Sequence, residues 1–216
     1  MTDFQFCKFI EVCKLMMHII YAPSMKLLYL SFATTLSFTA NAGNVVDTMF
    51  STQALIYQSK GAIDGCGIRF VGIQEFTSSN QLVRTVDGSF TIFSSGVSLT
   101  KVGMSITNST AVLNRNLNSM QVPIKSYWMR RVGGKITKPI DGKSSPSKDT
   151  KGFLLQAVEV DDFIDLLKAV NSDFEFQVGV TSQKENNEWI FAGKLKASEA
   201  DSARLGECLR SYAQTN

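Results

Sequence analysis

Residues 66–76 read CGIRFVGIQEF, and this stretch decides the fold. Its apolar residues occupy both alternating sets of positions, which is the pattern of a central strand covered on each side. The preceding residues 61–65, GAIDG, read as a turn, and residues 77–80, TSSN, break the pattern. We therefore expect a β-strand here, in the interior of a sheet, with other elements packed on both of its faces.

Further strands are predicted around this one because Val, Ile, Phe, Thr and Tyr alternate there between Gly, Asn and Ser breaks. A two-residue Gly133–Gly134 connection is expected to form a primed hairpin turn, since both of its central positions need a positive φ. Residues 141–152 are polar and contain Ser-Pro, which predicts a surface loop. The predicted strands are residues 81–86, 89–107, 120–132 and 135–140, and ALIY at 54–57 could open another.

The last part of the chain has the clearest pattern. Residues 152–160 predict a strand, and Asp161 is expected to cap a helix that ends near Val170. A strand hairpin follows at residues 173–195, and Ser198 is expected to cap a final helix. The shape and spacing of these last sixty or so residues resemble those of exported, β-rich proteins of the invasion-associated locus B kind, although those proteins carry further cysteines. The fold class predicted is α+β and β-rich, with an antiparallel sheet or sandwich-like core and a C-terminal strand-helix-hairpin-helix.

The N-terminal region predicts export. Residues 25–42 contain a positive Lys26, an apolar core from Leu27 to Phe38, and Ala40-Asn41-Ala42, a small-x-small pattern that signal peptidase accepts. The core of about twelve residues is shorter than the roughly twenty that span a bilayer. Cleavage would leave 43–216 as a single globular exported domain, periplasmic or secreted.

Residues 1–24 precede this signal and allow three interpretations. Translation could start at Met25, residues 1–42 could form one long leader and secretory signal, or residues 15–42 could be a membrane anchor. Pro23 and Lys26 disfavour the anchor, because proline breaks a helix and a lysine near mid-membrane costs about 2.5–3.5 kcal/mol on insertion scales. We therefore expect a signal proper that begins at Met25 and no stable transmembrane anchor.

Histidine and cysteine usage excludes several kinds of chemistry. The single histidine, His18, lies in the leader, so the exported part has no Ser-His-Asp or Cys-His catalysis and no histidine-ligated metal. Cys7 and Cys13 also lie in the leader, which leaves Cys66 and Cys208. In an oxidising compartment two cysteines favour a disulfide, and two thiolates alone do not make a zinc site. We expect a Cys66–Cys208 disulfide, no metal and no cofactor.

Two charged stretches are candidate sites. Glu159, Asp161, Asp162 and Asp165 could hold calcium or act as catalytic carboxylates, but acidic residues also favour the start of a helix, and their spacing fits no calcium loop. The second stretch, residues 125–138, is a predicted basic hairpin that could bind an anion or a partner. Its candidate residues are Trp128, Arg130, Arg131 and Lys135, where stacking and cationic contacts could combine.

The function expected from these observations is an exported, non-enzymatic module that binds an unknown protein or a surface polymer. The absence of histidine and of a catalytic motif favours a binding protein over an enzyme. Two alternatives stay open: a cell-wall hydrolase that acts through carboxylates such as Glu159 or Asp162, and an anionic-polymer binder that uses the basic 125–138 hairpin. Of the 22 basic and 19 acidic residues, three and two lie in the leader, and the remaining net charge of about +2 does not favour nucleic acid.

The export prediction is tested by the intact mass of the protein recovered from the extracytoplasmic fraction. We expect the mass of residues 43–216, less two hydrogens for the disulfide. A mass that retains residues 25–42 would contradict the cleaved signal.

Overall fold

Ten strands and two helices make up the described part of the computed structural model, which comprises residues 47–75, 82–108, 119–184 and 187–215. The predicted leader, residues 1–42, lies outside it. Seven strands form the larger sheet in the order β1-β2-β3-β4-β8-β7, with β5 also paired to β4. Their bounds are β1 Met49–Ser59, β2 Ala62–Glu75, β3 Leu82–Phe93, β4 Ser98–Asn108, β5 Met120–Val122, β7 Ser145–Pro146 and β8 Leu154–Val158.

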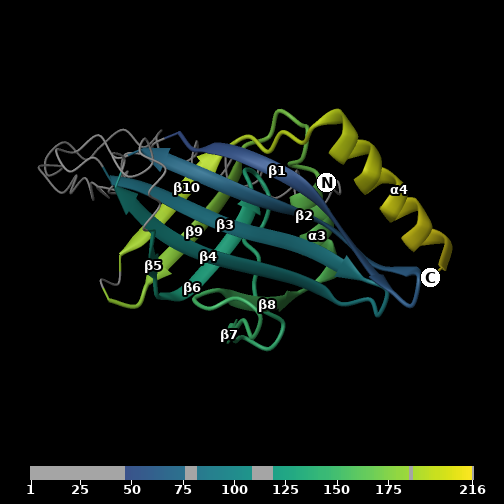
Figure 1. Cartoon of the computed structure of the whole chain (residues 1–216), viewed down its shortest axis with the longest axis horizontal. Coiled ribbons are helices and arrows are strands. Elements are labelled where there is room, and N and C mark those ends of the chain that lie inside the picture. Colours follow the sequence, from purple (N-terminus) through teal and green to yellow (C-terminus); the bar gives the residue numbers. More distant parts are fainter. Residues whose placement is uncertain (1–46, 76–81, 109–118, 185–186, 216) are drawn as a thin grey trace, which may run out of the picture. The chain divides into compact units, whose positions relative to one another are not determined.

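A smaller sheet has the order β10-β9-β6, with β6 Ile124–Arg131, β9 Phe176–Ser182 and β10 Glu188–Gly193. All strand pairs in both sheets are antiparallel. Figure 1 shows the smaller sheet crossing behind the strands of the larger one. The predicted class, α+β and β-rich with an antiparallel, sandwich-like core, is confirmed.

Strand β2 lies inside the larger sheet, as predicted, but only one of its faces is deeply buried. Cys66, Ile68 and Phe70 point to the core and are fully buried, whereas Arg69 and Ile73 alternate with them and are exposed. The prediction of two covered faces is therefore wrong. It treated the apolar residues of the outward set as a second buried face, although that set also contains an arginine.

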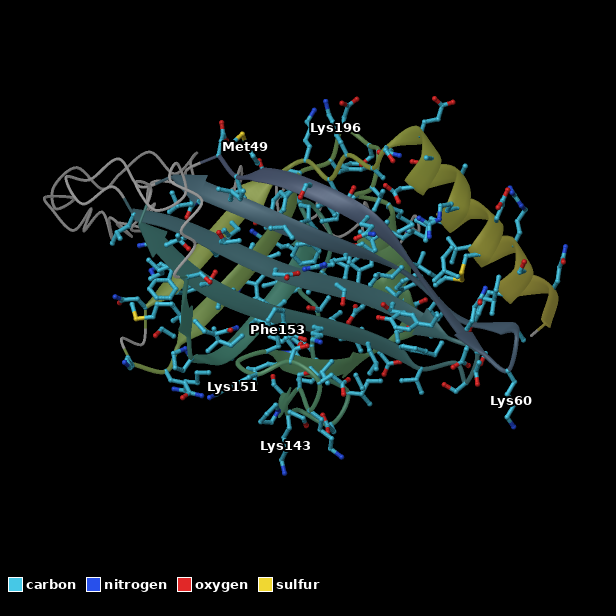
Figure 2. The ribbon with its side chains drawn as sticks, viewed as in Figure 1. Met49, Lys60, Lys143, Lys151, Phe153 and Lys196 are labelled. Carbon is cyan, nitrogen blue, oxygen red and sulfur yellow. A yellow bond between two sulfur atoms is a disulfide. The ribbon has the colours of Figure 1, made fainter. Side chains whose placement is uncertain are left out.

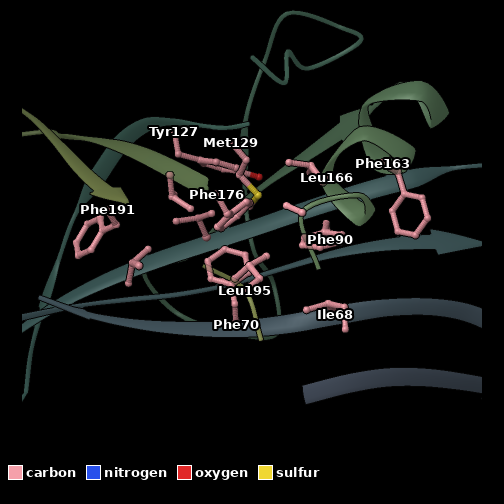
Figure 3. Packing of buried hydrophobic residues seen from close by; sticks show 14 of the residues in the cluster. Ile68, Phe70, Phe90, Tyr127, Met129, Phe163, Leu166, Phe176, Phe191 and Leu195 are labelled. Atoms are coloured by element: carbon pink, nitrogen blue, oxygen red, sulfur yellow. The ribbon is translucent and has the colours of Figure 1, made fainter. Parts of the chain in front are cut away.

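Aromatic rings hold the two sheets together. Phe176 of β9 lies with its ring centroid 5.5 Å from that of Phe50, 5.1 Å from that of Phe70 and 6.3 Å from that of Phe90, three residues of the larger sheet. Phe163, from the helix that follows β8, contacts Phe90 from the other side (Figure 3). Phe70, Phe90 and Phe176 are fully buried, whereas Phe50 is partly buried. Large buried rings contribute much of the hydrophobic stabilisation of a core, at about 25 cal/mol per Å² of apolar surface.

The two helices complete the layer that covers the inner face of the larger sheet. Helix α3 (Val160–Leu167) buries Phe163 and Leu166, and its N-cap is Glu159 rather than the predicted Asp161, which lies in the first turn. Helix α4 (Glu199–Thr215) begins after Ser198, as predicted, and the Ser198 hydroxyl accepts a hydrogen bond from the Asp201 amide.

Helix α4 also protects the edge of the sheet. The outer edge of β1 would offer unpaired backbone groups, but the Ala54 amide donates to the Asp201 carboxylate at 3.1 Å. The Ser198 hydroxyl donates to the same carboxylate, and both hydrogen bonds lower the pKa of Asp201. Near the other end of the buried helix face, Cys66 and Cys208 form a disulfide with their Cα atoms 5.8 Å apart, within the roughly 7 Å that a disulfide can bridge.

The primed hairpin turn occurs at a different place from the predicted one. Lys60 and Gly61 both have positive φ, 52° and 83°, and join β1 to β2 through the pair Ser59 and Ala62. At Gly133–Gly134 only Gly133 has a positive φ, and the Gly134 amide donates to the Arg131 carbonyl, the pattern of a type II turn. Residues 135–140 accordingly form no strand, so the predicted 125–138 hairpin is wrong in its second half.

Replacing both Cys66 and Cys208 by alanine should lower the free energy of unfolding by about 2–4 kcal/mol, because the disulfide closes a long loop. Relative to the unaltered protein, amide hydrogen exchange should become faster in α4 by a larger factor than in β2, because the disulfide holds the helix on the sheet. Exchange in α4 that is unchanged in the double variant would contradict the anchoring role.

Candidate binding site

The structure distributes the four predicted site residues over different surroundings. Side chains of β6 alternate, so that Tyr127 and Met129 are buried between the sheets while Trp128 and Arg130 lie on the outer face of the smaller sheet. Burial raises the pKa of Tyr127, whose hydroxyl donates to the Thr100 carbonyl. The outer face of the smaller sheet therefore carries only part of the predicted site.

Trp128 and Arg130 form a fixed pair on that face. The indole lies against the backbone of Gly179 and donates to the Glu188 carboxylate at 2.6 Å. The Arg130 guanidinium stands 5.3 Å from the centre of the indole ring and donates twice to the Gln177 amide oxygen. The two side chains thus contact each other, and whether they also contact a ligand, as predicted from the sequence, stays a prediction.

Arg131 has a structural role instead. Its guanidinium donates to the Asp165 carboxylate of α3 at 2.8 and 3.1 Å and lies 4.5 Å from the centre of the Phe174 ring. The side chains of the two ion-paired residues are only 16% and 22% exposed. Lys135 is exposed, beyond the turn. The four residues therefore do not form one continuous basic surface.

The acidic cluster belongs mainly to the start of α3. Asp161 and Asp162 lie in the first helical turn, where negative charge complements the helix dipole, and Asp165 is paired with Arg131. Glu159 is exposed at the N-cap. Among the described residues, no group of three or more His, Cys, Asp or Glu side chains lies close enough together to hold a metal ion.

A second surface, which the sequence did not single out, is the outer face of the larger sheet. Strand register places Gln53, Arg69, Ser89 and Lys101 directly opposite one another on β1, β2, β3 and β4. We call these four residues the polar row. It crosses three strand spacings, about 14 Å, at right angles to the strands.

Three recesses with volumes of about 590, 310 and 290 Å³ lie along this face, and Arg69 lines all three. The largest lies toward α4 and is also lined by Ala200, Asp201 and Arg204. The other two extend over β3 and β4 and share Asp87 and Phe153. The recesses therefore form a series across the sheet, with Arg69 at their common boundary.

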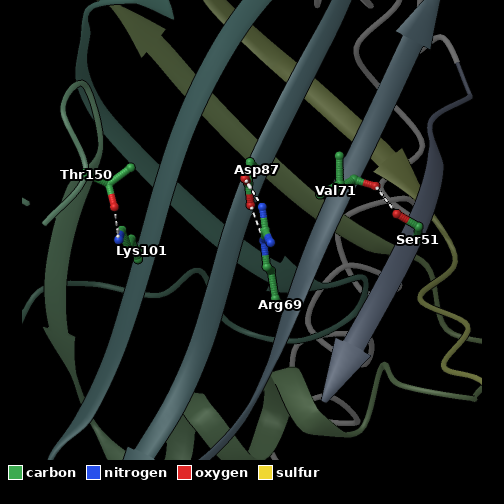
Figure 4. A network of polar contacts seen from close by, with 6 residues as sticks. All are labelled: Ser51, Arg69, Val71, Asp87, Lys101 and Thr150. Carbon is green, nitrogen blue, oxygen red and sulfur yellow. Dashed lines mark hydrogen bonds and ion pairs between the residues drawn. The ribbon is translucent and has the colours of Figure 1, made fainter. Parts of the chain in front are cut away.

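An ion pair fixes Arg69 in this position. Its Nε donates to one oxygen of Asp87 at 3.1 Å and its Nη2 to the other at 2.7 Å, as Figure 4 shows. The hydrogen bond and the negative charge of Asp87 raise the pKa of Arg69. With side chains 48% and 28% exposed, the pair adds little stability but holds the guanidinium in one orientation.

Aromatic side chains flank the polar row at two places. Phe153 packs against Gly103, where any Cβ would lie within 2.6 Å of the ring, and Lys101 stands 5.2 Å from the centre of that ring. Lys101 also donates to the Thr150 hydroxyl at 2.7 Å. On the opposite side of the polar row lies Tyr57 of β1, which is 42% exposed. In Figure 2 Phe153 lies in front of the larger sheet, on its outer face, while Lys143 extends away from it.

Sequence reasoning missed this surface because its residues are far apart in the chain. The signal available was Arg69, the one charged residue among the apolar positions 66–73. A charged side chain in a strand interior indicates that its side of the strand reaches solvent.

Comparisons with known proteins add no further information: no protein-family model matches the chain, and neither a curated protein nor a solved structure matches it significantly. Among the described residues, no helix is long and apolar enough to cross a membrane. The candidate site therefore depends on its geometry alone.

The Arg131–Asp165 pair gives a prediction about stability. From the sequence, replacing Arg130 and Arg131 should cost no more than about 1 kcal/mol, as for typical surface changes. The structure changes this expectation for Arg131: an Arg131→Ala variant should lose about 1–3 kcal/mol, because Asp165 would remain partly buried without its partner. Chemical denaturation would measure this, with Lys135→Ala as an exposed control that should change stability by less than about 0.5 kcal/mol. Equal effects of the two substitutions would contradict the structural role of Arg131.

Proposed function

We propose that this chain is an exported, non-enzymatic module that binds a surface polymer on the outer face of its larger sheet. The observation that carries this proposal is that three recesses on one sheet face share Arg69. A series of shallow recesses about as wide as four strands suits an extended ligand better than a compact one. Figure 1 shows these strands on the side toward the viewer, opposite the smaller sheet.

Export is supported by two independent features. Residues 25–42 have the three parts of a secretory signal. The Cys66–Cys208 disulfide suits an oxidising compartment, since such bonds are rare in cytosolic proteins. An exported module has access to polymers of the cell surface.

The hydrogen-bond partners and positions of the carboxylates favour a binding role over the hydrolase alternative. Asp87 and Asp201 line the recesses, but both already accept hydrogen bonds within the protein. Asp87 accepts from Arg69, and Asp201 accepts from the Ala54 amide and the Ser198 hydroxyl. The hydrolase candidates Glu159 and Asp162 line none of these three recesses. A carboxylate-based glycoside hydrolase needs two such groups facing each other across the substrate, about 5–10 Å apart.

The remaining alternative is an anionic-polymer site on the smaller sheet, and the Trp128–Arg130 pair is the observation in its favour. Two carboxylates lie next to this pair: Glu188 accepts a hydrogen bond from Trp128, and Glu175 accepts one from Gln177, the partner of Arg130. Negative charge beside Arg130 disfavours an anionic ligand there. The two candidate faces lie on opposite sides of the molecule, because the buried faces of the two sheets meet. Single substitutions can therefore separate them.

Native gel electrophoresis with soluble neutral and acidic polysaccharides cast into the gel would test the proposal. We expect at least one polymer to retard the protein, Arg69→Ala to abolish the retardation, and Arg130→Ala to leave it unchanged. Arg69 belongs to an exposed ion pair worth about 1 kcal/mol or less, so the Arg69→Ala variant should still fold. Retardation that depends on Arg130 instead would support the smaller-sheet site, and no retardation by any polymer would contradict the proposal.

A further inference from the structure

One edge of the Arg69 guanidinium is left open by the ion pair. Asp87 accepts hydrogen bonds from Nε and Nη2, the side edge of the group. Of its five N–H donors, the two on Nη1 and the second on Nη2 have no hydrogen-bond partner among the residues that the structure describes. One N–H of Nη1 and the second N–H of Nη2 form the end edge of the guanidinium, whose geometry matches the two oxygens of a carboxylate.

The exposure of the charged groups on this face favours an acidic ligand. The side chains of Arg69 and Arg204 are 48% and 56% exposed, whereas those of Asp87 and Asp201 are 28% and 19% exposed. The acidic groups thus lie deeper than the cations that they contact. A ligand that approaches the face meets guanidinium groups before it meets carboxylates, although the formal charges of the recess residues nearly cancel.

The remaining groups favour a ligand rich in hydroxyls. Gln53, Ser51 and Ser89 are uncharged donors and acceptors, which can exchange hydrogen bonds with hydroxyl groups. Tyr57 and Phe153 add ring surface on either side of Arg69, which can contact the apolar face of a sugar ring. This combination of a few placed polar groups and aromatic surface is typical of small-molecule and sugar sites.

An acidic peptide fits this surface less well. Extended peptides bind sheets by hydrogen bonding to an open strand edge, and the backbone groups of β2 and β3 are already paired on both sides. At the β1 edge, the Ala54 amide is bonded to Asp201. A polysaccharide instead needs only side-chain partners, which the sheet face offers.

We infer that the ligand is a carboxylate-bearing polysaccharide, which lies along the polar row and places a sugar carboxylate on the open end edge of Arg69. This inference rests on the proposed function and makes its ligand class specific. Lys101 and Arg204 would contact neighbouring sugar units on the two sides of Arg69. The chain crosses the strands rather than following them, because the polar row does so.

Isothermal titration calorimetry with oligomers of galacturonic acid tests this inference, with the same oligomers methyl-esterified at their carboxyl groups as the matched ligand. We expect the acidic oligomer to bind and the ester to bind about tenfold more weakly or worse. Arg69→Lys should weaken binding of the acid by a similar factor, because lysine keeps the charge but loses the two-pronged geometry. Arg210→Ala, a control on the exposed surface of α4 away from the recesses, should bind like the unaltered protein. Circular dichroism of each variant checks that it is folded.

The outcomes separate the two proposals. Equal binding of acid and ester that still depends on Arg69 would overturn the carboxylate inference and leave the polymer-binding function standing. Equal binding of poly-L-glutamate and the acidic oligomer would overturn the saccharide class. Failure of both forms of the oligomer to bind, together with retardation by another polysaccharide in native gels, would likewise overturn only the carboxylate inference. If no polysaccharide binds in either assay, both proposals fall.

Discussion

The alternation of side chains along β2 is the constraint on which the rest of the structure depends. Because successive residues of a strand point to opposite faces, Cys66, Ile68 and Phe70 face the core while Arg69 faces outward. The inward set supplies one half of the disulfide and one of the rings around Phe176. The outward set places a fixed guanidinium at the centre of an open face. A shift of one residue in register would exchange the two sets, so the core and the candidate site are specified together.

Closure of the sheet edge by α4 is the second requirement. A long edge strand such as β1 invites pairing with another chain, and Asp201 occupies the Ala54 amide in the middle of this edge by accepting its hydrogen bond. The same helix contributes Arg204 and Ala200 to the largest recess. The disulfide therefore stabilises the fold and, through α4, one end of the candidate site.

Much of the fold could be predicted from the sequence because it depends on local patterns. Alternation of Phe174, Phe176, Val178 and Val180 predicted β9, although the strand begins only at Phe176 and Phe174 is exposed. Ser198 predicted the start of α4. Setting aside Cys7 and Cys13 of the predicted leader left Cys66 and Cys208 as the expected disulfide partners. The errors arose where one sequence pattern is compatible with two structures. Gly133–Gly134 is compatible with a primed turn, but only Gly133 has a positive φ. The chain forms its primed turn at Lys60–Gly61, where pairing of β1 with β2 stabilises a positive φ in a lysine.

The candidate site could not be predicted in the same way. Its polar row joins residues 53, 69, 89 and 101, which become neighbours only through the register of three strand pairs. The basic residues at 125–138 stood out because they are close in sequence, yet alternation and the turn distribute them over different surroundings. Proximity along the chain was therefore a poor guide to proximity in space for strand residues.

We propose that the protein binds its ligand on the outer face of the larger sheet. The most direct test is two-dimensional NMR of the ¹⁵N-labelled protein during titration with a polysaccharide that retards it in native gels. We predict that the shifted amides cluster in β1, β2, β3 and β4 around Arg69, while those of β6 and β10 stay unchanged. Shifts concentrated around Trp128 and Arg130, with β2 unaffected, would contradict this proposal.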